Sequence, residues 1–214
     1  CPLLTSIGVS AFYSISNPAS TVSISNLTGL TSAASNSFSG FAGTASLTGP
    51  FTSWTGGCTN LGVPGINVQA VGEVPLTQAR YAAIAAGTDS AADITCIPAR
   101  EFQGFAGGVT LGELPLLATI GSNAFYNFKL ILTINAGACP LLTSIGEQAF
   151  YYVSNPASTV SFSNLTGLTS AASLSFYQFT GTASLTGPFT NWPGGCAYLG
   201  PGINVQAVGE VPLT

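Results

Sequence analysis

A short segment that ends in phenylalanine recurs along this chain and constrains its fold more than any other feature. Three of the copies read LTSIGVSAF, LATIGSNAF and LTSIGEQAF, which gives the pattern L-T-S-I-G-x-x-A-F. Six copies end at Phe12, Phe38, Phe102, Phe125, Phe150 and Phe176. Successive phenylalanines are therefore 26, 64, 23, 25 and 26 residues apart, and only the interval of 64 breaks the rhythm.

A period near 25 residues predicts a solenoid. One such unit is too small to bury its own apolar face, so neighbouring units must stack and share a continuous core. The six phenylalanines are expected to form one buried column. Alternating runs such as STVSFSN and KLILTIN predict strands with one face in the core. We expect a mostly β, leucine-rich-repeat-type solenoid with short turns and little helix.

The long interval between Phe38 and Phe102 requires a separate interpretation. It contains the Gly- and Pro-rich stretch GPFTSWTGGCTNLGVPG, which we interpret as an insertion next to a degenerate repeat. It also contains LTQARYAAIAAG, the best helix candidate of the chain, which should end at Gly87.

A second, longer repeat contains the short one. Residues 1–77 align with 139–214 at 76 positions, of which 13 differ, with one deletion at Val63. We therefore divide the chain into a first long repeat, 1–138, and a partial second copy, 139–214, within one continuous solenoid. The repetition suggests a segment of a tandem array.

The phased L-T-S-I-G-x-x-A-F strings, each followed by a short strand, resemble the BspA-like leucine-rich repeats of bacterial and protist surface proteins. The resemblance covers six coils clearly and most of the chain loosely. It implies an extracellular solenoid with a role in adhesion. The chain departs from the family pattern in its few Lys and Glu residues, in the insertion, and in the AA that replaces IG in alternate coils.

Charge is scarce, and this excludes several classes of function. The 214 residues include three Lys and Arg, seven Asp and Glu and no His, and residues 1–72 carry no charged side chain. Three basic residues cannot neutralise a run of phosphates, so we expect no nucleic-acid partner. Polar residues interrupt every apolar run before it reaches about 18 residues, so we expect no membrane span.

The same composition argues against an enzyme. Without His, general acid or base chemistry would depend on seven scattered carboxylates. Their closest grouping is Asp89 and Asp93 with Arg100 and Glu101, which we interpret as a solvent-facing loop cluster. The cysteine spacing matches no zinc pattern, so neither a metal nor a cofactor is expected.

Five cysteines in so uncharged a chain favour an oxidising, extracellular or cell-surface location. The pairs Cys1–Cys58 and Cys139–Cys196 occur in both copies of the long repeat, whereas Cys96 occurs once, so we predict those two disulfides. The competing pair is Cys58–Cys96. Asn26 and Asn164 begin NLT sequences and are candidate N-glycosylation sites, with a turn asparagine as the alternative.

Three functions fit these observations. The first is a structural extracellular protein that associates head-to-tail with copies of itself, because charge is scarce and no polar capping repeat is visible. The second is a surface adhesin with a solenoid binding face. Besides copies of the chain itself, glycans are a candidate partner. The third is binding to ice or another crystal surface, which is weakened by the lack of a regular Thr-x-Thr pattern. Trp54 and Trp192 are either local packing residues or exposed contacts for a sugar or a neighbouring subunit.

Overall fold

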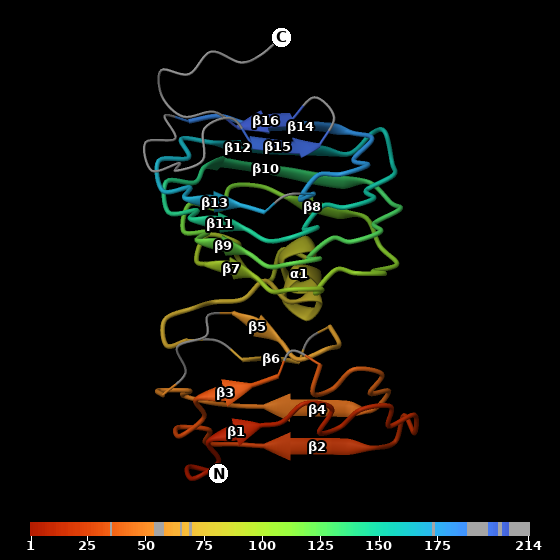
Figure 1. The fold of residues 1–214 in the computed structure, drawn as a ribbon, viewed down its shortest axis with the longest axis vertical. Helices are drawn as coiled ribbons and strands as arrows, with labels where there is room; N and C mark the ends of the chain where they lie inside the picture. The colour runs from red at the N-terminus through yellow and green to blue at the C-terminus, as the bar shows by residue number, and fades with distance from the viewer. Residues whose placement is uncertain are drawn as a thin grey trace.

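The computed structural model is an elongated stack of coils that runs from the N-terminal strands at one end to the last strands at the other (Figure 1). It describes residues 1–34, 36–53, 58–64, 66–68, 70–172, 174–187, and the strand residues 197–200 and 203–205. No cis peptide bond occurs in these residues.

Each regular coil contributes one short and one longer strand. The short strands coincide with the T-S-I part of the repeat and are β1 (Ser6–Ile7), β3 (Ser32–Ala33), β7 (Cys96–Ile97), β9 (Thr119–Ile120), β11 (Ser144–Ile145) and β13 (Ser170–Ala171). The longer strands are β2 (Thr21–Ile24), β4 (Thr44–Leu47), β8 (Val109–Leu111), β10 (Leu132–Ala138), β12 (Thr159–Ser163) and β14 (Thr182–Leu185).

Strands of successive coils pair in parallel. The long sheets have the orders β7-β9-β11-β13 and β8-β10-β12-β14, and the N-terminal coils pair β1 with β3 and β2 with β4. Thr119 pairs with Ser144, and Ser144 pairs with Ser170. Each step along the sheet is therefore one repeat, which is the defining register of a solenoid. The predicted mostly β solenoid is confirmed.

The IG pair allows successive coils to approach closely. An added Cβ at Gly146 would lie 2.4 Å from the backbone nitrogen of Ser122, and one at Gly121 would lie 2.3 Å from that of Ala99. Real Cβ atoms do not approach backbone so closely, so a larger residue at either position would push the coils apart.

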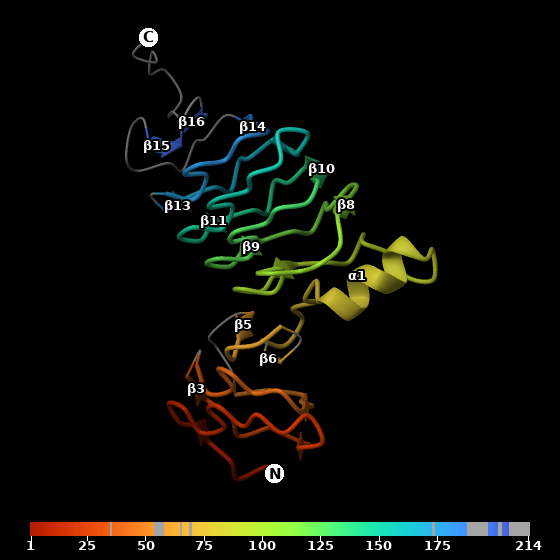
Figure 2. The ribbon, with the colours of Figure 1, turned by 90° about the vertical axis from the view of Figure 1, so that its right-hand side faces the viewer.

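The predicted insertion breaks this regularity. It contains an antiparallel hairpin of β5 (Thr59–Asn60) and β6 (Asn67–Val68), followed by α1 (Gln78–Ala85), which lies beside the stack in Figure 2. Thr77 caps α1 by accepting a hydrogen bond from the Arg80 amide, and Gly87 follows it with φ of 72°. The second copy has a matching antiparallel hairpin of β15 (Ala197–Gly200) and β16 (Ile203–Val205).

The insertion also divides the hydrophobic core. One buried cluster extends from Ile7 to Val68 and the other from Leu76 to Phe179. The restart of the long repeat at Cys139 falls inside the second cluster, where β10 of the first copy pairs directly with β12 of the second. The core therefore breaks at the insertion, at a different place from the sequence repeat.

Candidate functional site

The repeat phenylalanines form two stacked groups. Phe102, Phe125, Phe150 and Phe176 stack with successive ring centroids 5.0, 5.4 and 4.7 Å apart, and all four are fully buried. Phe12 and Phe38 form the second group, at 4.5 Å, where Phe12 is half-buried. Between the two groups, the backbone amide of Phe38 donates a hydrogen bond to the carbonyl of Leu61. The β5–β6 hairpin thus replaces a phenylalanine-bearing coil at that level.

The chain turns sharply on both sides of these phenylalanines. The residue two positions before Phe has φ of 56° at Ser10, 58° at Arg100, 59° at Asn123 and 55° at Gln148. Left-handed backbone also recurs two positions after Phe, for example at Gly104 and Asn127. These turns project side chains outward at one rim of the stack, which we call the turn face.

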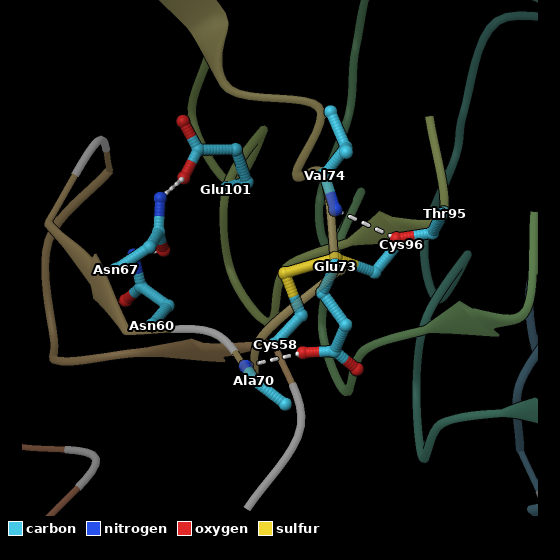
Figure 3. Close-up of a disulfide and its surroundings, with 9 residues drawn as sticks. All are labelled: Cys58, Asn60, Asn67, Ala70, Glu73, Val74, Thr95, Cys96 and Glu101. Carbon is cyan, nitrogen blue, oxygen red and sulfur yellow. Dashed lines mark hydrogen bonds between the residues drawn. A yellow bond between two sulfur atoms is a disulfide. The ribbon is translucent and has the colours of Figure 1, made fainter. Parts of the chain in front are cut away.

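The predicted Cys1–Cys58 disulfide is wrong. Cys58 is bonded to Cys96, with their Cα atoms 6.2 Å apart, as Figure 3 shows, and Cys1 is exposed with a free thiol. The physical reason is the insertion: it places Cys58 beside β7, whereas Cys1 lies in the first coil at the far end of the N-terminal block. Cys139 is buried with a free thiol, and its predicted partner Cys196 lies outside the described residues.

A buried polar group also joins the two parts of the stack. Glu101 is fully buried and accepts hydrogen bonds from the side-chain amide of Asn67 at 3.2 Å and the backbone amide of Gln78 at 2.8 Å. Gln78 begins α1, so the Glu101 carboxylate occupies the favourable position at a helix N-terminus. Figure 3 shows the hydrogen bond between Asn67 and Glu101, near the disulfide.

The predicted solvent-facing loop cluster of Asp89, Asp93, Arg100 and Glu101 is therefore wrong for Glu101, which is buried. Glu101 turns inward to the hairpin and α1, while Asp89 and Asp93 form ion pairs with Arg80. The Asp89 pKa is lowered by its hydrogen bonds from the Ser90 amide and the Arg80 guanidinium. The sequence analysis missed Arg80 because the eight residues 81–88, at the end of the helix and in the following loop, separate it from Asp89.

A metal site is weakly supported in the described part of the chain. Its one group of potential ligands is Cys58, Glu73 and Cys96, whose ligand atoms lie within 4.8 Å of one another. The two sulfur atoms are joined in the disulfide, and Glu73 accepts a hydrogen bond from the Ala70 amide at 2.8 Å. A disulfide offers no thiolate to a metal, so we interpret the group as structural.

The remaining predicted residues lie on the surface or outside the described chain. Asn26 and Asn164 are exposed and have φ of 56° and 51°, in matching turns after β2 and β12. Both side chains are thus accessible, and their glycosylation stays a prediction. Trp54 and Trp192 lie outside the described residues.

A row of tyrosines lies along the turn face, one position after Phe125, Phe150 and Phe176. Tyr126, Tyr151 and Tyr177 stack with ring centroids 5.3 and 5.5 Å apart, and Tyr152 lies 6.2 Å from Tyr151. Tyr152 and Tyr177 are exposed, at 44% and 37%. Alignment of the repeats on Phe would have shown this tyrosine row, but its stacking depends on the spacing of the coils.

The tyrosine row ends beside a cavity of about 600 Å³. Three successive coils supply Arg100, Asn123 and Gln148, each two positions before its phenylalanine. Gln103 and Tyr126, each one position after its phenylalanine, also line the cavity. Ser39 and the hairpin residues Gly62 and Pro64 form the opposite wall. The cavity therefore lies where the insertion interrupts the stack.

A threonine row crosses the flank formed by β8, β10, β12 and β14. Thr110, Thr133, Thr159 and Thr182 are in register. Each strand contributes one threonine and not a Thr-x-Thr pair, so the row is a single column. The row is not evident in the sequence, because the four threonines are 23, 26 and 23 residues apart and these intervals differ from the intervals between the phenylalanines.

The comparisons with known proteins identify the repeat. Residues 92–191 match the family model described as "BspA type Leucine rich repeat region (6 copies)". This part of the chain is a BspA type leucine-rich repeat region. The match confirms the resemblance inferred from the motifs, and it covers most of the longer core cluster. No curated protein and no solved structure matches the chain.

The match over residues 92–191 agrees with the described architecture. The BspA type repeat family is a family of bacterial surface proteins, and leucine-rich-repeat solenoids are typically non-enzymatic. The helix α1, with eight residues, is the longest in the described chain, and no helix there is long and apolar enough to cross a membrane.

Proposed function

We propose that this chain is a structural extracellular repeat protein whose coils associate end to end with those of neighbouring copies. One observation carries the proposal. Nearly the same sequence occurs in two environments, at the outer face of the first coil and inside the stack, and only the second environment buries it.

The comparison is direct because the two copies align residue by residue. Phe12 is half-buried while Phe150 is fully buried, and Leu4 is half-buried while Leu142 is fully buried. An added Cβ at Gly8 would meet no atom within 4 Å, whereas one at the equivalent Gly146 would meet Ser122 at 2.4 Å. The same side chains are thus buried once a coil lies on each side of them, and the near-identity of the two copies makes coils of different molecules equivalent partners.

The strand edges support the same proposal. The strands β11 and β12, which are equivalent to β1 and β2, pair with strands of the coils on both sides, so a coil of this sequence pairs through both of its edges. Unpaired strand edges recruit other strands unless charges or prolines block them. No charged side chain occurs in residues 1–72 to do so.

The repeat supplies a matched pair of variants to test association. The carbonyls of Ser20 and Ile24 accept bonds from the following coil, so the amide of Ser23 points away from it, towards the free edge. Ser161 is the equivalent residue, but it pairs with Asn135 of the preceding coil. Proline is tolerated at an edge and removes a ladder bond in a sheet interior.

We therefore expect Ser23→Pro to abolish association without changing the unfolding temperature. Ser161→Pro should lower that temperature by roughly 4–8 °C, because about 2 kcal/mol corresponds to such a shift in a chain of this size. Sedimentation velocity and negative-stain images measure association, and calorimetry measures stability. A wild-type chain that stays monomeric at high concentration would overturn the proposal.

Ice or crystal-surface binding is a second candidate, favoured by the threonine row. The hydroxyls of its four residues make no hydrogen bond within the described chain, and three of the four side chains are exposed. Thr143 and Thr169 on the opposite sheet differ, because their hydroxyls donate to backbone carbonyls of the preceding coil at 3.1 Å. Parallel strands about 4.8 Å apart hold the free hydroxyls in a regular row.

The adhesin hypothesis and the absence of catalytic activity stay predictions. We propose neither an active site nor a cofactor, and the turn face is the surface on which an adhesive contact would form.

A further inference from the structure

We propose that the cavity on the turn face binds an acidic saccharide, with Arg100 as the residue that selects the sugar carboxylate. The inference gives the adhesin hypothesis a specific ligand class and does not depend on end-to-end association of coils.

The polar residues of the cavity have no structural role in the described chain. The side chains of Arg100, Gln103, Asn123 and Gln148 make no hydrogen bond or ion pair there. Hydrogen bonds from the backbone amides of Arg100 and Asn123 already stabilise their turns. Four planar polar groups therefore line one cavity with their donors and acceptors unused by the protein.

The position of Arg100 reinforces this point. Its backbone has φ of 58°, which is uncommon for a residue other than Gly, Asn or Asp. The equivalent turn positions hold Ser10, Asn123 and Gln148, so the turn itself does not need an arginine. The charge is thus available to a ligand rather than to the fold.

The chemistry of the lining fits a sugar ring. Planar amide and guanidinium groups can each bond two neighbouring hydroxyls, and the Tyr126 ring offers an apolar face for the C–H side of a pyranose. Tyr126 stacks on Tyr151, so the platform is already ordered before a ligand arrives. A volume of about 600 Å³ lies within the usual range for small-ligand sites.

The charge distribution favours an acidic sugar. Arg100 is the one charged residue among the described residues that line the cavity, in a chain with net charge −4. A guanidinium forms two parallel hydrogen bonds to a carboxylate, which a neutral hydroxyl cannot match. An acidic peptide could satisfy Arg100 as well, but it would gain little from the tyrosine platform.

The test uses the full chain, with trigalacturonic acid and its methyl ester as probes in isothermal titration calorimetry. Arg100→Gln removes the charge and introduces a residue that Gln148 shows to be compatible with this turn. Lys129→Gln, at an exposed position outside the lining, is the matched control for charge. Tyr126→Ala tests the platform.

We expect saturable binding of the acid and at least tenfold weaker binding of the ester, since a charge-assisted contact of about 1.5 kcal/mol or more corresponds to that factor. Arg100→Gln should lower the affinity for the acid to that for the ester. Tyr126→Ala should lower the affinity for both probes, and Lys129→Gln should change neither affinity. Absence of binding to the acid would overturn the proposal. So would equal losses in Arg100→Gln and Lys129→Gln, or tetraglutamate binding that is as tight as that of the acid and unaffected by Tyr126→Ala.

Discussion

At the residue scale, position in the stack decides what a repeated side chain contributes. Phe125 has a stacked phenylalanine on each side, at 5.0 and 5.4 Å, and is fully buried. Phe12 has one stacked neighbour, at 4.5 Å, and is half-buried. Equivalent residues of the repeat should therefore contribute different amounts to the free energy of unfolding.

We predict that Phe125→Ala lowers the free energy of unfolding by about 3–5 kcal/mol, the range for a large aromatic side chain lost from a core. Phe12→Ala should cost less than half as much in the monomer, because part of its ring is already in solvent. Urea denaturation at low protein concentration measures both. Equal losses would show that the first coil is as well covered as the inner ones.

Burial also makes the two described free thiols chemically different. Desolvation raises the pKa of Cys139 to about 11 from its ordinary value of 9.0, because the thiolate is unfavourable in the core. In the unfolded chain the thiol loses its proton at the lower pKa. The stability that Cys139 contributes is therefore complete below about pH 9 and declines as the pH rises from about 9 to 11.

We predict that iodoacetamide at pH 8 labels Cys1 quickly and leaves Cys139 unlabelled in the folded protein, since the thiolate is the reactive species. Mass-spectrometric peptide mapping measures the labelling of each cysteine. The same experiment in urea is the control, in which both should react. Rapid labelling of Cys139 in the native chain would contradict the burial assigned to it.

At the element scale, the insertion is the part of the chain that does not follow the repeat. The β5–β6 hairpin replaces a coil at Leu61, and three contacts attach it to the coil that follows: the Cys58–Cys96 disulfide, the Asn67–Glu101 hydrogen bond, and the chain connection through α1. The disulfide bridges a sequence separation of 38 residues. It therefore joins the two core clusters.

We predict that the double change Cys58→Ser with Cys96→Ser lowers the free energy of unfolding by about 3–4 kcal/mol, as expected for a loop of this length. Cys1→Ser, which breaks no bond, is the control and should leave stability unchanged. Peptide mapping under non-reducing conditions should recover Cys58 and Cys96 in one linked pair. Recovery of Cys1 linked to Cys58 would restore the pairing expected from the repeat.

At the scale of the whole molecule, the parallel register converts scattered residues into continuous surfaces. The turn face carries the tyrosine row and the cavity, and the opposite flanks carry threonines. On one flank the hydroxyls are free, and on the other those of Thr143 and Thr169 are bonded to backbone. The two flanks thus provide an internal comparison for surface binding.

If the free threonine row binds ice, the chain should show freezing hysteresis that Thr159→Tyr abolishes, because a large ring in the middle of the row prevents flat contact. Thr143→Tyr, on the other flank, should leave the hysteresis unchanged. Both side chains are exposed, so we expect stability to change by no more than about 0.5 kcal/mol in either variant. A wild-type chain without hysteresis, or equal loss in both variants, would exclude this second candidate.

The sequence by itself determined the fold class, the coil length and the family. A period of about 25 residues leaves each unit unable to bury its own apolar face, so stacking of coils follows from the pattern alone. The inward positions of Phe102, Phe125, Phe150 and Phe176 follow for the same reason, since an aromatic residue at a fixed phase must face the shared core.

Only the tertiary structure decided which residues meet across coils and across the insertion. Cys58 pairs with Cys96 because the hairpin folds towards the next coil. The occurrence of Cys1 and Cys58 in both copies of the long repeat had predicted Cys1 as the partner. Glu101 is buried by Asn67 and α1, and the threonine row exists because strands separated by unequal sequence intervals are brought into register. Such contacts depend on how the irregular segments place the regular ones, and that geometry is not encoded in the period of the repeat.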